Sequence, residues 1–110
     1  MGSDYLPTVE VADLPVGAMK KVTVNGKEIL LTNIDGDIFA VDSVCTHFGG
    51  DLSLGTLEAN VITCQRHQAK FDVTTGRVLS PPKVGPYNPK IVDLTAYPVK
   101  IEANKVLIKL

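Results

Sequence analysis

The sequence contains no tryptophan, only two cysteines and two histidines, and no excess of either charge. Its 110 residues carry 11 Lys and Arg against 12 Asp and Glu, which gives a formal net charge of −1 at pH 7. Nucleic-acid binding needs clustered basic side chains to neutralise phosphates, so this balance argues against a nucleic acid as partner. Two cysteines are fewer than a small disulfide-stapled secreted domain normally carries, which leaves one disulfide or metal ligation as their alternatives.

Long hydrophobic runs are also absent. No window approaches about 18 consecutive apolar residues, the length of a membrane-spanning helix. The first residues, MGSDYLPTVEV, lack the basic and apolar regions of a signal peptide. We therefore expect a cytoplasmic protein without a membrane span. With 110 residues, of which 45% are hydrophobic, the chain should form one domain over 1–110. Its core is small, so we expect its loops to be fixed by something beyond hydrophobic burial, such as a metal centre.

Helical periodicity is missing as well, since no long segment carries an apolar stripe at i, i+3, i+4 and i+7. β-Branched and alternating runs between turn residues instead predict an all-β fold. Asn25-Gly26 and Asp35-Gly36 are signals for type I′ hairpin turns, so we expect a three-stranded antiparallel meander over about 19–42. Ala103-Asn104 should turn a final hairpin. The remaining expected elements are one short helical turn at Asp51–Leu57 and strands at Asn60–Thr63, Lys70–Val73, Arg77–Leu79, Ala96–Glu102 and Lys105–Leu110.

The segment from Ser43 to about Thr95 is irregular, because glycines and prolines break it into loops. Long loops in a small domain are usually functional. Within this segment, Gly55 and Gly76 are predicted as turn glycines with positive φ.

All the thiol and imidazole side chains fall in two short clusters of this segment. Cys45 and His47 form a C-x-H pair and, after sixteen residues, Cys64 and His67 form a C-x-x-H pair. A Cys₂His₂ zinc finger usually groups its cysteines together and its histidines together, whereas here each cluster mixes the two. A binuclear iron–sulfur centre with two cysteines on one iron and two histidines on the other uses this donor set. A structural zinc site and a purely structural role for the four side chains are the alternatives.

The two clusters lie in longer motifs that resemble the Rieske [2Fe–2S] family. The first cluster-binding loop of the family is similar to Cys45-Thr46-His47-Phe48-Gly49-Gly50, and the second to the run from Cys64 through Phe71-Asp72 to Gly76. The family's proline loop is similar to Ser80-Pro81-Pro82, and the strand before its last hairpin to Tyr97-Pro98-Val99. The resemblance therefore covers most of the chain.

This resemblance implies an all-β Rieske-type antiparallel sandwich or barrel. Strands from both ends of the chain would form its base, and a loop-rich cluster-binding subdomain would be inserted over about 43–82. The resemblance further implies that Cys45 and Cys64 ligate one iron of a [2Fe–2S] cluster and that His47 and His67 ligate the outer iron. Pro81-Pro82 would shield the cluster.

Two departures indicate which kind of Rieske protein the sequence resembles. In the respiratory and photosynthetic membrane complexes, each loop carries an additional cysteine, and a serine and a tyrosine donate hydroxyl hydrogen bonds to cluster sulfurs. This sequence has Gly50 and Arg66 at the cysteine positions and Ala69 and Phe71 at the hydroxyl positions. It is similar instead to the soluble, low-potential Rieske ferredoxins of bacterial oxygenases and to their archaeal counterparts.

The function implied by the resemblance is one-electron transfer from a reductase to an oxygenase or another oxidoreductase, with no substrate chemistry. A terminal oxygenase would need further histidines for a mononuclear iron, and both histidines are already used. A non-catalytic subunit of a larger complex such as a nitrite reductase and a zinc-binding interaction module are the alternatives. Two features are unusual: Gln68 stands where the family commonly has glycine, and the segment Lys83–Thr95 is longer than the family pattern.

Overall fold

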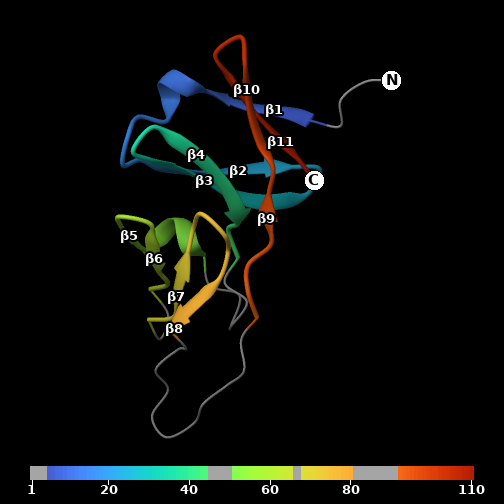
Figure 1. The fold of residues 1–110 in the computed structure, drawn as a ribbon. Coiled ribbons are helices and arrows are strands. Elements are labelled where there is room, and N and C mark those ends of the chain that lie inside the picture. Colours follow the sequence, from blue (N-terminus) through green and yellow to red (C-terminus); the bar gives the residue numbers. More distant parts are fainter. Residues whose placement is uncertain (1–4, 45–50, 66–67, 81–91) are drawn as a thin grey trace, which may run out of the picture.

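Eleven β-strands and two 3₁₀ helices make up the described part of the chain, which covers residues 5–44, 51–65, 68–80 and 92–110 of the computed structural model (Figure 1). The strands form three antiparallel sheets, an upper, a middle and a lower one in the view of Figure 1. This architecture confirms the all-β prediction.

The middle sheet contains the predicted meander. Its strands follow the order β2 (Met19–Val24), β3 (Lys27–Ile34), β4 (Asp37–Asp42) and β9 (Ala96–Tyr97). Both hairpin turns have positive φ at their two central residues, 50° and 80° at Asn25 and Gly26, and 54° and 99° at Asp35 and Gly36. Type I′ turns require this conformation, which asparagine, aspartate and glycine adopt most easily.

The upper sheet joins the two ends of the chain in the order β1 (Tyr5–Glu10), β11 (Lys105–Lys109) and β10 (Val99–Glu102). The predicted turn at Ala103-Asn104 connects β10 to β11, with φ of 51° and 65°. The strand β1, which contains Pro7, was not placed individually from the sequence, although the resemblance implied base strands from both ends of the chain. Among the described strands it lies at the sheet edge and pairs with β11 alone, where a missing N–H is tolerated. The short helix η1 (Val11–Asp13) follows β1.

The strand expected over Ala96–Glu102 is divided at Pro98, where the chain passes from the middle sheet to the upper one. The single-strand prediction was therefore wrong at this point. Proline cannot donate to a strand ladder, so it commonly stands where pairing ends.

The lower sheet contains β5 (Thr56–Glu58), β6 (Val61–Thr63), β7 (Lys70–Asp72) and β8 (Val78–Ser80), in that order. The helical turn predicted over 51–57 is confined to the 3₁₀ helix η2 (Leu52–Leu54). The residues after it form β5, which was not predicted, because their conformation is set by pairing with β6 and not by a local pattern.

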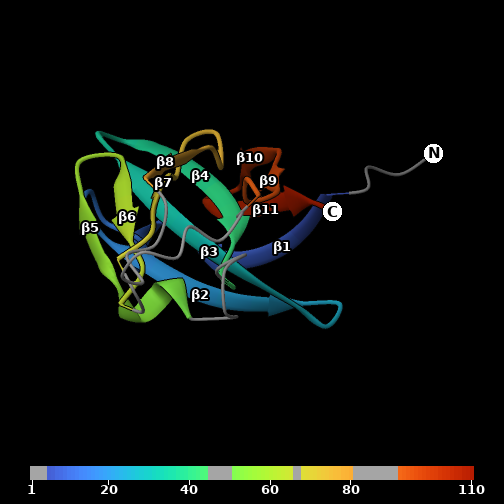
Figure 2. The same cartoon turned by 90° about the horizontal axis from the view of Figure 1, so that it is seen from below.

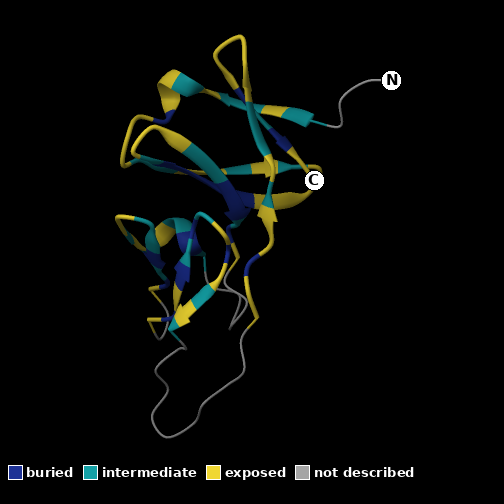
Figure 3. Ribbon diagram, viewed as in Figure 1, coloured by how far each residue is buried: buried dark blue, intermediate teal, exposed yellow. Residues whose placement is uncertain are grey.

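Two hydrophobic cores fill the two faces of the middle sheet (Figure 3). Ile29 and Leu31 of β3 pack toward β11 of the upper sheet, whereas Leu30 packs toward β6 and β7 of the lower sheet. Seen from below, the lower sheet lies in front of the middle one (Figure 2), and the two sheets share one of these cores. The strand β3 is thus buried on both faces. The lower sheet, which carries the predicted ligand loop between β6 and β7, packs against the middle sheet through this shared core.

Candidate metal centre

The second predicted ligand pair lies in the hairpin loop between β6 and β7. Thr63 pairs with Lys70 at the end of the ladder, and the backbone N–H of Cys64 donates to the carbonyl of Ala69 at 2.8 Å. This hydrogen bond closes the loop at its base. Cys64 therefore stands where the loop leaves the sheet, and its thiol is free and fully buried.

The surroundings of Cys64 on the protein side are apolar. Because side chains alternate along a strand, Cys64 and Ile62 point to one face of the hairpin, and Ala69 and Phe71 stand opposite them on the same face. All four are fully buried and share one core with Leu30 of the middle sheet. An unpaired thiolate is costly to bury in such a place, whereas a bound metal ion stabilises that form. The donor type and its burial fit the cysteine side of an iron–sulfur centre.

The first predicted ligand pair lies in a loop whose stem the structure describes. Val44 forms a β-bridge with Asp51, and the N–H of Leu52 donates to the carbonyl of Ser43 at 2.7 Å. Residues 45–50 connect the two sides of this stem. Cys45, His47 and Gly50 therefore lie outside the described residues, as do Arg66 and His67 of the second loop and Pro81-Pro82 of the predicted shield.

Gly55 shows how the two stems come together. Its φ is −83°, so the predicted positive φ was wrong. Glycine is needed for a different reason, because a Cβ at this position would lie 2.1 Å from the carbonyl oxygen of Thr63. Thr63 directly precedes Cys64, and η2 begins directly after the first stem. The backbones that carry the two loops therefore touch each other.

Gly76 has the predicted positive φ, 83°. The turn it belongs to is held by Asp72, whose carboxylate accepts a hydrogen bond from the N–H of Thr74 at 2.9 Å. Asp72 is thus a local turn residue in this structure. No group of three or more His, Cys, Asp and Glu side chains in the described ranges could hold a metal ion.

Asp51 is the polar centre of the first stem. Its carboxylate accepts hydrogen bonds from the N–H of Ser53 at 2.9 Å, the Ser53 hydroxyl at 2.6 Å, the Ser43 hydroxyl at 3.2 Å and the Lys21 ammonium of β2 at 2.7 Å. The Lys21 and Ser53 hydrogen bonds lower the pKa of Asp51 to about 2. Sequence analysis assigned no role to Asp51 or Lys21, although aspartate before a short helical turn is a recognised capping signal.

Gln68 follows His67 and has a left-handed backbone, with φ of 60°. Its side chain is exposed, as is that of Gln65. A residue without a Cβ adopts this conformation without strain. This backbone torsion explains why the family commonly has glycine at the position of Gln68. The glutamine adopts the same left-handed conformation at some cost in folding free energy.

Asp42, the last residue of β4, forms hydrogen bonds with the segment that returns from the lower sheet to the middle sheet. The N–H of Asp42 donates to the carbonyl of Thr95 at 3.0 Å, and its carboxylate accepts the Thr95 N–H at 3.3 Å and the Tyr97 hydroxyl at 2.5 Å. Burial, followed by this hydrogen bond, raises the pKa of Tyr97 to about 12. The segment that enters the first stem is thereby fixed to the segment that returns to the middle sheet.

Comparison with known proteins gives one consistent result. The Rieske [2Fe–2S] domain family matches residues 4–98. The ferredoxin component of the naphthalene 1,2-dioxygenase/salicylate 5-hydroxylase systems of Ralstonia sp is 39% identical over 110 residues, which are 100% of this chain and 99% of that protein.

Solved structures agree in fold. The ferredoxin of carbazole 1,9a-dioxygenase from Nocardioides aromaticivorans IC177 superposes with a TM-score of 0.85 at 23% identity, over 97% of this chain and 98% of that one. A chain in the complex of reduced oxygenase and oxidised ferredoxin of carbazole 1,9a-dioxygenase has a TM-score of 0.82 at 25% identity, over 98% of this chain and 94% of its own.

Proposed function

The chain belongs to the Rieske [2Fe–2S] family, and from this premise we propose that Cys45 and Cys64 hold one iron of its cluster and His47 and His67 the other. As a ferredoxin of this family the chain carries a [2Fe–2S] cluster and is an electron carrier, not an enzyme. The observation that supports the ligand assignment is the position of Cys64, a free and fully buried thiol at the base of a closed hairpin loop.

The cysteine and histidine ligands are proposed to have different roles around the cluster. When bound, a [2Fe–2S] group supplies one-electron redox chemistry. Cys64 belongs to the core between the lower and middle sheets, so the cysteine side of a bound centre would face protein and would be shielded from water. We therefore assign the exit of the electron to the histidine side, through the imidazole edges of His47 and His67. Protonation of these rings would follow the redox state, because an added electron favours the charged imidazolium.

We propose that a reductase supplies the electron and that an oxygenase receives it. Support comes from the Ralstonia relative, a ferredoxin component of dioxygenase and hydroxylase systems, and from the complex of an oxygenase with a ferredoxin whose fold this chain shares. These matches favour an oxygenase ferredoxin over a nitrite reductase subunit and over a zinc module. In the described residues no helix is long and apolar enough to cross a membrane. We propose a cytoplasmic location.

We further propose that residues 1–110 form one Rieske domain with a cluster-binding subdomain over about 43–82. The lower sheet supports this division, because its four strands lie between Thr56 and Ser80 and pair only with one another in the described ladders. The middle and upper sheets take their strands from both sides of this segment.

Metal analysis with electron paramagnetic resonance tests the proposal. The purified protein should contain two irons and two acid-labile sulfides per chain, and the dithionite-reduced form should give the low average g value of a mixed histidine and cysteine cluster. Cys45→Ser and Cys64→Ser should each lose this signal. One equivalent of zinc without labile sulfide would contradict the assignment. A signal with the g values of an all-cysteine cluster would contradict the histidine ligands.

A further inference from the structure

We propose that Asp51, held in place by Lys21, is a positioning residue that fixes the first cluster-binding loop against the middle sheet. This inference rests on the proposed function of Cys45 and His47 as ligands in that loop. It concerns the stem of the loop, which the structure describes on both sides.

The contacts of Asp51 connect three separate elements. Ser43 comes from the incoming side of the stem, Ser53 from η2 on the outgoing side, and Lys21 from β2. Ser43 is fully buried, and its N–H donates to the carbonyl of Glu28 on β3 at 3.0 Å. One side of the stem is therefore tied to the middle sheet through the backbone, and the other is tied through the ion pair of Asp51 and Lys21.

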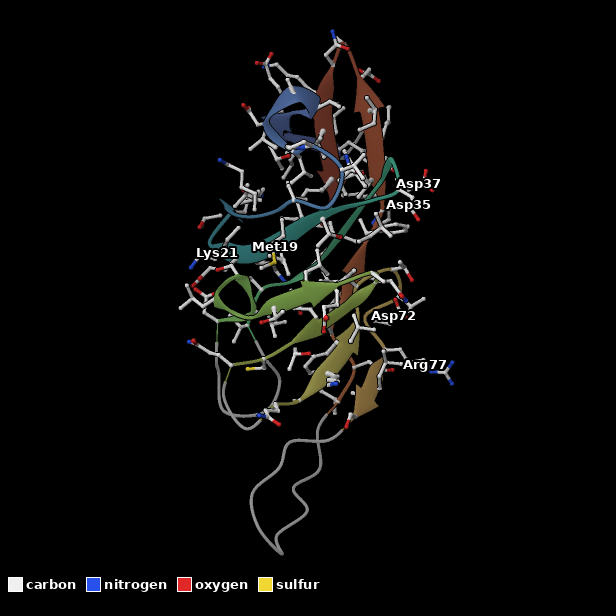
Figure 4. All side chains as sticks on the ribbon, turned by 90° about the vertical axis from the view of Figure 1, so that its left-hand side faces the viewer. Met19, Lys21, Asp35, Asp37, Asp72 and Arg77 are labelled. Carbon is white, nitrogen blue, oxygen red and sulfur yellow. The ribbon has the colours of Figure 1, made fainter. Side chains whose placement is uncertain are left out.

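Lys21 lies on the face of β2 that this role requires. Met19, two residues earlier on the same face, packs against the core between the middle and lower sheets. Figure 4 shows Lys21 and Met19 on the side of the middle sheet that faces the lower sheet. Lys21 also contacts Glu28 at 3.2 Å, which keeps its ammonium beside the stem. Lys20 points to the opposite face and is exposed, so it offers a matched control of the same charge.

A positioning role differs from a simple effect of charge. Through charge alone, loss of the Asp51 carboxylate would raise the reduction potential of the cluster and loss of the Lys21 cation would lower it, with the loop unchanged. If the two residues hold the loop through one contact, removing either should loosen the same ligands. The two changes should then act in the same direction and should not add.

The test uses the purified holoprotein and its variants Asp51→Ala, Asp51→Asn, Lys21→Met, the double variant Lys21→Met/Asp51→Ala, Lys21→Arg and Lys20→Met. The first readout is the rate at which visible absorbance is lost in an excess of iron chelator. The second is the set of g values of the reduced cluster. We expect Lys21→Met to accelerate cluster loss by up to about fivefold, since it removes the partly exposed ion pair with Asp51. Asp51→Ala should accelerate it by about tenfold or more, since it also removes the hydrogen bonds from Ser43 and Ser53.

The double variant should lose its cluster no faster than Asp51→Ala. Lys21→Arg and the control Lys20→Met should both lose it at the wild-type rate. The g values of Lys21→Met and Asp51→Ala should shift in the same sense. Asp51→Asn retains an oxygen that can accept from Ser53, so it provides a folded comparison if Asp51→Ala does not fold. Wild-type rates and g values in Lys21→Met and Asp51→Asn, with or without opposite shifts in potential, would overturn the positioning role. A wild-type protein without labile sulfide would instead overturn the proposed function.

Discussion

Replacing Ala69 by serine should raise the reduction potential of the bound cluster. Ala69 stands directly across the hairpin from Cys64, and both side chains are fully buried on the same face. The Cβ atoms of residues that face each other in an antiparallel pair lie about 4.5–5.5 Å apart. The hydroxyl introduced by Ala69→Ser therefore comes within reach of the sulfur of Cys64 or of a neighbouring cluster sulfide, with no water to compete for it.

The size of the effect follows from the strength of one charge-assisted hydrogen bond. A hydroxyl that donates to a cluster sulfur stabilises the reduced state, which is the more negative one. If this preference is about 1.5 kcal/mol, the potential rises by about 65 mV for a one-electron couple. Phe71→Tyr should act in the same direction. Phe71 pairs with Ile62, one step diagonal from Cys64 on the same face, a separation of about 7–8 Å that an aromatic side chain can span.

Potentiometric titration followed by visible absorbance and by electron paramagnetic resonance measures these shifts. The wild-type potential should lie toward the low end of the family range of about −150 to +300 mV, because both hydroxyl donors are absent. Val73→Thr is the matched control, since it adds a hydroxyl to the same buried face two residues beyond Phe71. It should lower stability and leave the potential unchanged. The reasoning is refuted if Ala69→Ser retains its cluster at the wild-type potential, or if Val73→Thr raises the potential equally.

Three further predictions concern stability. Thr32 is fully buried, and its Oγ1 has no hydrogen-bond partner in the described residues, so Thr32→Val should raise the free energy of unfolding by about 1 kcal/mol in a denaturant titration; a loss of stability would mean that the hydroxyl has a partner. Tyr97 has its pKa raised to about 12 from 10.0, so the unfolded chain releases this proton first and the free energy of unfolding should fall as pH rises from 10 to 12. Tyr97→Phe should lack that part of the pH dependence, and an identical profile would contradict the shift. Gln68 has φ of 60°, so Gln68→Val should lower the melting temperature while Gln68→Gly should not; equal losses in both variants would show that the Gln68 side chain matters more than its backbone.

Local signals account for the parts of the fold that could be predicted. The turns at Asn25-Gly26 and Asp35-Gly36 have a conformation that their own residues favour, so the meander could be placed from the sequence. The strand β1 could not, because it exists only by pairing across almost the whole chain, with Tyr5 opposite Lys109. Its proline is tolerated because this strand lies at the sheet edge and its register with β11 shifts after Pro7.

The candidate site likewise contains features that the sequence indicated and features that it did not. The spacing of the two clusters and their resemblance to the Rieske loops indicated the ligands, and the structure describes Cys64 in a suitable place. The ion pair of Lys21 and Asp51 joins residues 30 positions apart, and no sequence pattern announces such a pair. Gly55 was predicted to have a positive φ, but glycine is required there because the backbone of Thr63 leaves no room for a Cβ. Only the folded chain creates this contact.

These contacts bear on how much a bound cluster has to contribute to folding. Metal binding is coupled to folding wherever the unfolded chain has no preformed site. Here the ends of both predicted ligand loops are held by contacts that involve no predicted ligand side chain: the Val44 and Asp51 bridge, the Cys64 and Ala69 backbone hydrogen bond, and the approach of Gly55 to Thr63. Contacts of this kind lower the entropic cost of assembling the site, because they order the loop ends through groups other than the ligands. A larger share of the binding free energy then remains for holding the cluster itself.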